Sequence, residues 1–234
     1  MPIQTVFLDA GGVLVNPNWS RVSETLNRHG VTAAAAALAA AEPHAKKRLD
    51  TGDTVSATND AQRGWTYFNL VLTEAGVTLS DATTAALAEL QTYHQQFNLW
   101  ESVPDEVQPA LAALRARGFK LVVVSNANGR LRYLFDRLGL SGSVDALFDS
   151  YDEGVEKPDP RFFRRALERT GGEAESTIHV GDFYHIDVAG ARAAGITPAM
   201  LDVAGLYPEC DCLRVRSLAE LVSVLEAKTA TSHG

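Results

Sequence analysis

Residues 3–14 read IQTVFLDAGGVL, an apolar run that ends in the carboxylate of Asp9 and then breaks at a Gly-Gly pair. The length and β-branched content of this run favour a buried strand over a helix. Asp9 then lies at the carboxyl end of the strand, the edge at which open α/β sheets bind their ligands. The alternative is a turn residue whose carboxylate hydrogen-bonds its own loop. From this stretch alone, both interpretations of Asp9 stay open.

The composition is that of a globular protein with enough apolar residues for a sizeable core. The chain has 234 residues, of which 46% are hydrophobic, and a formal net charge of -8. This length suits one large domain or two modest ones. An acidic chain gives no electrostatic reason to expect a nucleic-acid partner, because nucleic-acid binders usually carry a basic face.

No segment of the sequence predicts membrane insertion or secretion. No stretch approaches the roughly 20 apolar residues that span a bilayer, and residues 1–14 lack the pattern of a signal peptide. We therefore expect a cytoplasmic protein with no membrane partner. The two cysteines, Cys210 and Cys212, are too close together for a stabilising disulfide and too few for a four-ligand zinc site, so we expect reduced thiols.

Residues 16–99 differ in character from the rest of the chain, because they are rich in alanine and contain no continuous strand-like run. Gly30, Gly52 and Gly76 are expected to break this segment, and Ser80 is expected to cap a helix. We expect helices at residues 19–29, 32–49, 59–75 and 81–97. The segment is thus predicted to be an all-helical insertion that follows the first strand.

From Pro104 onward, helical and strand-like stretches alternate. Predicted strands lie at residues 119–124, 146–150, 177–180 and 197–201, and predicted helices at 105–117, 130–138, 160–170, 187–194 and 217–227. Asp159 is a suitable N-cap and Pro160 fits the first helical position. This alternation predicts the α/β class with a doubly wound parallel sheet.

Polar residues follow the strands of the predicted sheet. Asp9 follows the first strand, Ser125 and Asn126 follow the next, and Asp182 follows residues 177–180. Because the carboxyl ends of parallel strands meet at one edge, these side chains are expected to converge on one crevice. Asp187 and Lys157 each begin a predicted helix near the same edge.

Taken in this order, these residues resemble the four signature motifs of the haloacid dehalogenase superfamily, most of whose members are magnesium-dependent phosphohydrolases. The most specific single piece is VGDFYHIDVAGARAAG, residues 180–195. The resemblance covers residues 2–14 and about 100–201. It implies a Rossmann-like core, residues 1–15 and 100–234, and a helical cap domain, residues 16–99.

The resemblance implies a role for each motif residue in hydrolysing a small phosphorylated metabolite. Asp9 would attack phosphorus and form an aspartyl-phosphate, which splits the reaction into two easier steps. Mg²⁺ would be held by the Asp9 carboxylate, the Gly11 carbonyl oxygen and Asp182, with Asp187 supporting it through water.

The phosphoryl oxygens would be held by three further residues. Ser125 offers its hydroxyl, and Asn126 offers a backbone N–H at the start of a helix. Lys157 supplies a positive charge between Asp9 and the phosphoryl group. Ser125 and Lys157 are thus catalytic candidates together with Asp9, and Asn126 is a substrate-binding candidate.

One position departs from the phosphatase pattern. Phosphatases of this superfamily usually carry a second aspartate, the general acid and base, two residues after the nucleophile, and here that residue is Gly11. Losing general acid–base help costs about 10²- to 10⁴-fold in rate. The sequence therefore predicts a slow phosphatase that works best on good leaving groups.

Gly11 leaves three explanations open. In the first, water, the substrate or a cap histidine (His29, His44 or His94) transfers the proton in a phosphatase-type enzyme. In the second, the protein is similar to 2-haloacid dehalogenases, whose first motif also reads Asp-Ala-x-Gly, although Asp182 with Asp187 favours a metal site. In the third, the protein binds metal without catalysis.

Two further possibilities have less support in the sequence. A variant similar to phosphonoacetaldehyde hydrolase would use Lys46 or Lys47 as a Schiff base. A nucleotide-binding oxidoreductase is disfavoured because no Gly-x-Gly-x-x-Gly follows the first strand. The identity of the substrate is not encoded in any readable motif, and the sequence is compatible with a monomer or a homodimer.

Overall fold

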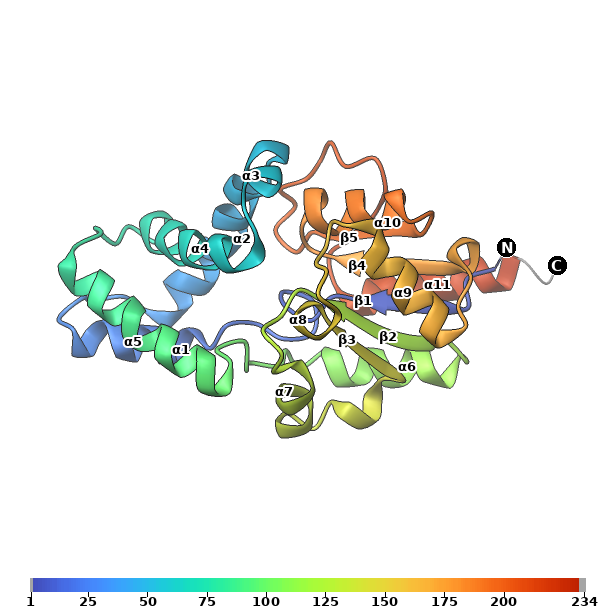
Figure 1. The fold of residues 1–234 in the computed structure, drawn as a ribbon, viewed down its shortest axis with the longest axis horizontal. Helices are drawn as coiled ribbons and strands as arrows, with labels where there is room; N and C mark the ends of the chain where they lie inside the picture. The colour runs from blue at the N-terminus through green and yellow to red at the C-terminus, as the bar shows by residue number, and fades with distance from the viewer. Residues whose placement is uncertain (1, 232–234) are drawn as a thin grey trace. The chain divides into compact units, whose positions relative to one another are not determined.

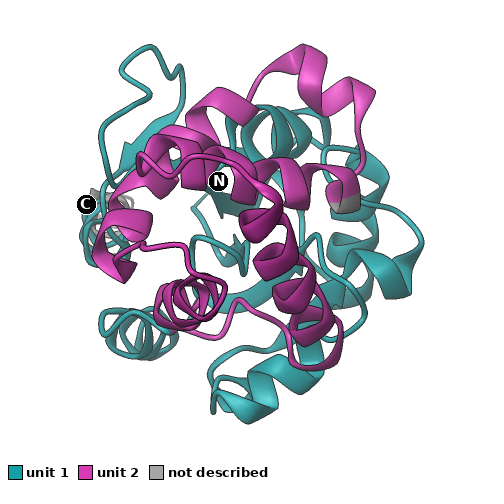
Figure 2. Cartoon of the chain, turned by 90° about the vertical axis from the view of Figure 1, so that its left-hand side faces the viewer, with its two compact units in different colours: residues 1–16, 103–234 teal, residues 17–102 magenta. Residues whose placement is uncertain are grey.

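The computed structural model describes residues 2–231 and divides the chain into two compact units. One unit consists of Met1–Asn16 and Val103–Gly234, and the other of Pro17–Ser102 (Figure 2). We call the first the sheet unit and the second the helical unit, and each is described by itself.

A six-stranded sheet forms the centre of the sheet unit (Figure 1). Its strands are β1 (Thr5–Leu8), β2 (Lys120–Ser125), β3 (Ala146–Asp149), β4 (Thr177–Gly181), β5 (Thr197–Leu201) and β6 (Leu213–Val215). Their order is β3-β2-β1-β4-β5-β6, and each neighbouring pair is parallel. The predicted doubly wound parallel sheet is confirmed. The order of the strands reverses between β1 and β4, the point at which such sheets bind ligands.

Helices connect the strands of this sheet. They are α6 (Val107–Ala116), α7 (Leu131–Arg137), α8 (Ser150–Glu153), α9 (Pro160–Thr170), α10 (Ala189–Ala193) and α11 (Leu218–Thr231), with a π-helix at Tyr184–Val188 and short 3₁₀ turns at Ser141–Ser143 and Ala174–Ser176. Asp159 caps α9 by accepting the Arg161 N–H, and Pro160 is the first helical residue, as predicted.

Apolar side chains bind the helices to the sheet. Phe162 and Phe163 of α9 are fully buried and pack with Ala191 of α10 against Phe7 and Val122 of the sheet. Full burial of one such aromatic side chain contributes about 1.5–3 kcal/mol. Helices α6 and α11 pack against each other. Every residue of β1 is buried, so only its carboxyl end can present groups to a ligand.

Several predicted boundaries were wrong. The third strand ends at Asp149 because Ser150 already begins α8, and β2 extends to include Ser125. Asp187 does not begin an α-helix but lies inside the π-helix. Strand β6 and helix α8 were not predicted, because they have three and four residues and are too short for a periodic pattern.

The helical unit contains α1 (Trp19–Arg28), α2 (Ala35–Leu49), α3 (Gly52–Ala57), α4 (Asp60–Glu74) and α5 (Asp81–Phe97). Ser80 caps α5 as predicted. Gly52 was expected to be a break, but it begins α3, whose N-terminus is capped by Thr51. In the described part of the chain, no helix combines the length and apolarity that crossing a membrane requires.

A cluster of aromatic rings and a backbone hydrogen bond between its two ends help to hold the helical unit together. The rings of Tyr67, Phe68 and Trp100 pack with centroids 5.0–5.9 Å apart. At the ends of the unit, the Asn18 N–H donates to the Leu99 carbonyl oxygen at 2.9 Å, so the first and last residues of the unit lie side by side.

Candidate functional site

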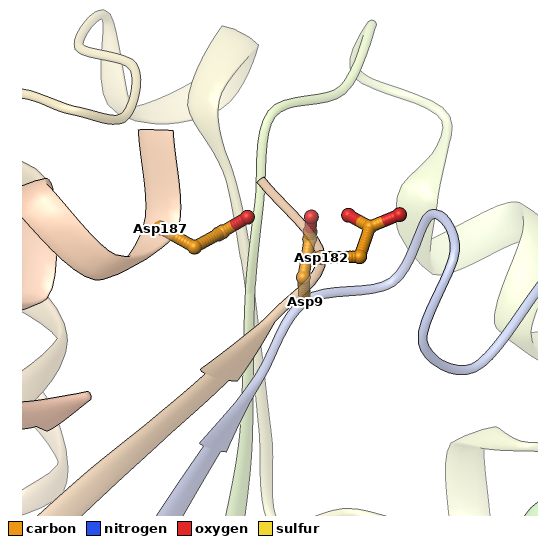
Figure 3. Close-up of side chains that lie close together, drawn as sticks. All are labelled: Asp9, Asp182 and Asp187. Carbon is orange, nitrogen blue, oxygen red and sulfur yellow. The ribbon is translucent and has the colours of Figure 1, made fainter. Parts of the chain in front are cut away.

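The carboxyl ends of β1 and β4 bring two carboxylates together. Leu8 pairs with Val180, and the Asp9 N–H donates to the Val180 carbonyl oxygen at 2.9 Å. Asp9 and Asp182 therefore leave neighbouring strands at nearly the same level (Figure 3). The direction of both strands, rather than a local turn, places these side chains at the sheet edge.

Asp187 completes a cluster of three carboxylates. Ligand oxygens of Asp9, Asp182 and Asp187 all lie within 4.8 Å of one another, and Asp187 points toward Asp9 from the π-helix (Figure 3). Gly181 makes this approach possible, because a Cβ at Gly181 would lie 2.1 Å from the Asp187 Cγ. No side chain larger than hydrogen fits at residue 181 while Asp187 keeps this position.

Lys157 is the cation of the cluster. Its Nζ lies 2.9 Å from Asp9 Oδ1 and 2.7 Å from Asp187 Oδ1, and its side chain is 0% exposed. The Asp9 Oδ1 also accepts the Ala10 N–H at 2.7 Å. Both contacts of the Asp9 carboxylate thus involve Oδ1, and no residue in the described part of the chain hydrogen-bonds its Oδ2.

Lys157 and Asp187 keep each other ionised. Burial disfavours charged Lys157, but the carboxylates of Asp187 and Asp9 outweigh it and raise the pKa of the lysine above its usual range. Burial likewise favours a protonated Asp187, yet Lys157 and the hydrogen bond from His179 hold the pKa of this carboxyl well below its ordinary value. With three carboxylates and one ammonium, the cluster has a formal charge of -2, which a divalent cation would balance.

His179 belongs to this cluster, although the sequence analysis did not single it out. It lies on β4, is 0% exposed, and places its Nε2 2.9 Å from Asp187 Oδ1. Burial lowers the pKa of His179, so the imidazole is neutral near pH 7 and Nε2 donates the proton to Asp187. A histidine within an otherwise apolar strand, close to an acid after the strand, was the available signal.

Asn126 occupies a different setting from the one predicted. Helix α7 begins only at Leu131, so the Asn126 N–H lies in a loop and not at a helix N-terminus. Its side chain holds the backbone of Lys157: Nδ2 donates to the Lys157 carbonyl at 3.0 Å, and Oδ1 accepts the Lys157 N–H at 2.8 Å. Ser125 is the last residue of β2 and is buried.

Gly11 lies in the turn that follows Asp9. It forms an isolated β-bridge with Val15 and does not have a positive φ, so a residue with a side chain can adopt its backbone conformation. Gly12 has a positive φ of 73° and therefore favours glycine. The two glycines of the first motif are thus not equivalent.

The histidines and lysines considered for proton transfer or Schiff-base chemistry lie in the helical unit, where several have partners. His29 Nε2 lies 2.9 Å from Glu89, and His94 Nδ1 accepts the Leu99 N–H at 3.1 Å. Lys46 forms an ion pair of 2.9 Å with Glu42. His44 and Lys47 lie on α2.

The donor set suits a hard divalent cation. Mg²⁺ prefers oxygen ligands at about 2.0–2.1 Å, so oxygens on opposite sides of one ion lie about 4.2 Å apart. The 4.8 Å bound of the cluster is close to this separation. Both oxygens of Asp187 already have partners, because its Oδ1 accepts from Lys157 and His179 and its Oδ2 accepts the Phe183 N–H at 3.1 Å.

Comparison with known proteins supports one family. A family model described as haloacid dehalogenase-like hydrolase matches residues 3–195. Haloacid dehalogenase-like hydrolase domain-containing protein 3 of Mus musculus is 34% identical over 166 residues, which are 68% of this chain and 65% of the relative. Glyceraldehyde 3-phosphate phosphatase of Methanopyrus kandleri is 33% identical over 132 residues, 56% of this chain and 55% of the relative.

The chain spans less than two thirds of the length of these curated relatives. Among solved structures, that of the putative HAD-hydrolase YfnB from Bacillus subtilis bound to magnesium superposes with a TM-score of 0.69 at 19% identity. This match covers 96% of the present chain and 99% of YfnB, and it supports the fold alone.

Proposed function

The chain belongs to the haloacid dehalogenase-like hydrolase family and is a hydrolase, and from this premise we propose that it is a magnesium-dependent phosphatase of a small phosphorylated metabolite. The observation that carries this proposal is the cluster of Asp9, Asp182 and Asp187 around a fully buried Lys157. The phosphatase activity of the Methanopyrus kandleri relative is consistent with it.

Asp9 is proposed as the nucleophile. Its Oδ1 is held by the Ala10 N–H and by Lys157, which fixes the orientation of the carboxylate. Oδ2 would attack phosphorus to give an aspartyl-phosphate as the bond from phosphorus to the ester oxygen breaks, and that oxygen would take up a proton and leave as an alcohol. Water would then attack the aspartyl-phosphate, releasing phosphate and regenerating the Asp9 carboxylate. Fixing the attacking group in advance lowers the entropic part of the barrier.

The metal is proposed to lie among the Asp9 carboxylate, the Gly11 carbonyl oxygen and Asp182, with Asp187 acting through water. The occupied oxygens of Asp187 favour this indirect role over direct ligation. When bound, Mg²⁺ would neutralise charge on the nucleophile and the phosphoryl group, two anions that otherwise repel each other.

Ser125, Asn126 and Lys157 are proposed to hold the phosphoryl oxygens. The Ser125 hydroxyl and the Asn126 N–H would donate to them, and Lys157 would offer a remaining N–H of its ammonium group. Because the Asn126 side chain also hydrogen-bonds the Lys157 backbone, one residue would position both the N–H that binds the phosphoryl group and the lysine. Preorganised donors of this kind are the main means of stabilising a phosphoryl transition state.

Gly11 cannot carry a proton, so we expect slow turnover with a preference for good leaving groups. The helical unit is proposed to act as the cap that closes over the site and selects the substrate. The proton would come from water, from the substrate or from a cap histidine. Residues 1–15 and 100–234 would then form the catalytic core, and residues 16–99 the cap.

The proposal is tested with p-nitrophenyl phosphate. We expect release of phosphate that Mg²⁺ stimulates, that a chelator abolishes and that Asp9→Asn reduces to background. The matched control is Asp105→Asn, which removes one exposed carboxylate of the same unit and should keep wild-type activity.

Two outcomes would overturn the proposal. Halide release from a 2-haloacid that withstands the chelator would instead assign a dehalogenase. Magnesium binding with no turnover of any phosphate ester in a broad panel would assign a binding protein that keeps the fold.

A further inference from the structure

The loop between β2 and α7, residues 126–130, carries the Asn126 N–H but has no helix of its own to fix it. Ser125 pairs in register with Asp149, so the end of β3 lies directly beside the start of this loop. A donor that must bind a phosphoryl group needs a rigid support, because an error of about 1 Å can cost 10²-fold in rate. The residues that provide this support are therefore of functional interest.

Asp149 forms most of that support. Its Oδ2 accepts the N–H groups of Gly129 at 2.9 Å and Leu131 at 3.2 Å. Its Oδ1 accepts the Tyr151 N–H at 3.0 Å. The residue is 5% exposed. Burial raises the pKa of Asp149, while hydrogen bonds from the three N–H groups oppose this rise.

Neighbouring residues hold the same loop. The Ser150 Oγ accepts the Ala127 N–H at 3.1 Å and lies 3.3 Å from the Ala127 carbonyl oxygen, to which it can donate. The ring of Tyr151 lies over Gly129, where a Cβ would be 2.8 Å from the tyrosine Cδ1. Three consecutive residues, Asp149 at the end of β3 and Ser150 and Tyr151 at the start of α8, thus hold the loop at residues 127 and 129 and the start of α7 at residue 131.

A simple helix cap does not account for this arrangement. Asp149 does cap α8 through Tyr151, but that task needs one acceptor oxygen. The second oxygen is committed to Gly129 and Leu131, on a segment that is not part of α8. An exposed serine or asparagine would cap α8 without the cost of burying a carboxylate.

We propose that Asp149 is a positioning residue for phosphoryl binding: it holds residues 126–131 so that the Ser125 hydroxyl and the Asn126 N–H face the phosphoryl group. This inference rests on the proposed phosphatase function. Asp149 itself touches neither the phosphoryl group nor the metal. Its substitution should weaken phosphate binding and leave metal binding intact.

The test compares Asp149→Asn with wild type. The asparagine keeps the shape of the side chain but turns an NH₂ group toward backbone N–H donors. In Mg²⁺ we expect the affinity for inorganic phosphate, measured by calorimetry, to fall about tenfold, the equivalent of one lost charge-assisted hydrogen bond. The affinity for Mg²⁺ alone should stay within about twofold, because distinct residues hold the metal. Hydrogen exchange of the Gly129 and Leu131 amides should accelerate.

Asp152→Asn is the matched control, because it removes the same charge from an exposed residue of α8. It should bind phosphate as wild type does. If Asp149→Asn fails to fold, Asp149→Ser replaces it: the hydroxyl can still cap α8 through Tyr151 but is too short to support Gly129 and Leu131.

Each remaining outcome overturns the inference. Equal phosphate affinity in wild type and variant would mean that the loop needs no such support. Equal losses of phosphate and Mg²⁺ affinity would assign Asp149 a purely structural role. A wild-type protein that binds no phosphate would overturn the proposed function together with this inference. If wild type binds phosphate and the Asp149 variants bind it equally well, only this inference fails and the proposed function stands.

Discussion

Lys157 is the residue on which the charge balance of the site depends. It is fully buried between Asp9 and Asp187, and Asp182 adds a third carboxylate nearby. A buried ion pair adds little net stability when intact, but removing one partner leaves an uncompensated charge in a medium of low polarity. We therefore expect the lysine to matter for the stability of the fold as well as for the proposed chemistry.

We expect Lys157→Met to lower the free energy of unfolding by about 3–5 kcal/mol, because the carboxylates lose the cation that pairs them. Urea unfolding followed by circular dichroism measures this change. Lys120→Met is the control, because it removes an exposed lysine of the same unit and should cost little. If the loss at Lys157 were no larger than the control's, the carboxylates would not be ionised together as described.

Gly11 decides how fast the proposed reaction can run. Unlike Gly12, Gly11 does not have a positive φ, so its backbone conformation does not require glycine. We expect Gly11→Asp to raise the turnover of an aryl phosphate, because the aspartate can act as a general acid and base. The full benefit of such catalysis, about 10²- to 10⁴-fold, is the upper limit of this gain. The pH–rate profile should then acquire a new ionisation.

Gly11→Asn is the control for this gain, because asparagine matches aspartate in size and cannot transfer a proton. Equal rates for the two variants would show that volume or loop rigidity matters at this position, not proton transfer. Loss of folding in both would mean that the turn tolerates no side chain.

At the level of helices and strands, the sequence predicted the long elements and missed those that depend on tertiary contacts. Buried runs such as residues 119–124 and capped helices such as α5 and α9 carry their own signal. The π-helix at Tyr184–Val188 carries no such signal, and its residue Asp187 contacts Lys157 and His179, which lie 30 and 8 positions away in the chain. Local propensity cannot report such long-range partners.

The same limit applies to the site. Strand ends predicted that Asp9, Ser125 and Asp182 would share an edge, and the structure places them at the ends of neighbouring strands. The supports were harder to predict. His179 gave a weak signal as a histidine in a strand eight residues before Asp187, whereas the partner of Asp149, Gly129, lies 20 positions away with no pattern that links the two. The catalytic roles themselves stay predictions.

Glu101 joins the two ends of the helical unit. Its side chain is 9% exposed and accepts hydrogen bonds from Asn18, Arg21 and Tyr93 at 2.9–3.1 Å. Burial alone would raise the pKa of Glu101, but the hydrogen bonds from Arg21, Tyr93 and Asn18 outweigh it and lower the pKa. The ionised form is therefore the one that stabilises the fold.

We expect Glu101→Gln to lower the free energy of unfolding by about 1–2 kcal/mol at pH 7. Because the folded pKa is lowered, this contribution is complete above the unfolded value of about 4.3 and is lost as the pH falls through the folded pKa. Urea unfolding at pH 7 and below pH 4, followed by tryptophan fluorescence, should show the difference shrinking in acid. Glu24→Gln, an exposed change on α1, should show no such dependence.

At the scale of the whole molecule, the two units carry different optical probes. The tryptophans are Trp19, Trp65 and Trp100, and all three lie in residues 17–102. Tryptophan fluorescence therefore reports on the helical unit, while far-ultraviolet circular dichroism reports on both. Each unit also has its own buried core.

We expect the two units to unfold in separate steps, since domains with their own cores commonly depart from two-state behaviour. Lys157→Met should move the urea midpoint seen by circular dichroism and leave the fluorescence midpoint in place. Coincident shifts of both midpoints would show one cooperative unit. A wild-type comparison of the two signals provides the baseline.

The hydrogen bond between Asn18 and Leu99 has an evolutionary consequence. A segment whose two termini are neighbours can be exchanged for another of the same kind without rerouting the chain that carries it. If the helical unit selects the substrate, as proposed, a lineage could acquire a new substrate by exchanging residues 17–102 while Asp9, Lys157 and Asp182 keep their places. The same juxtaposition marks the two positions at which a laboratory graft should be joined.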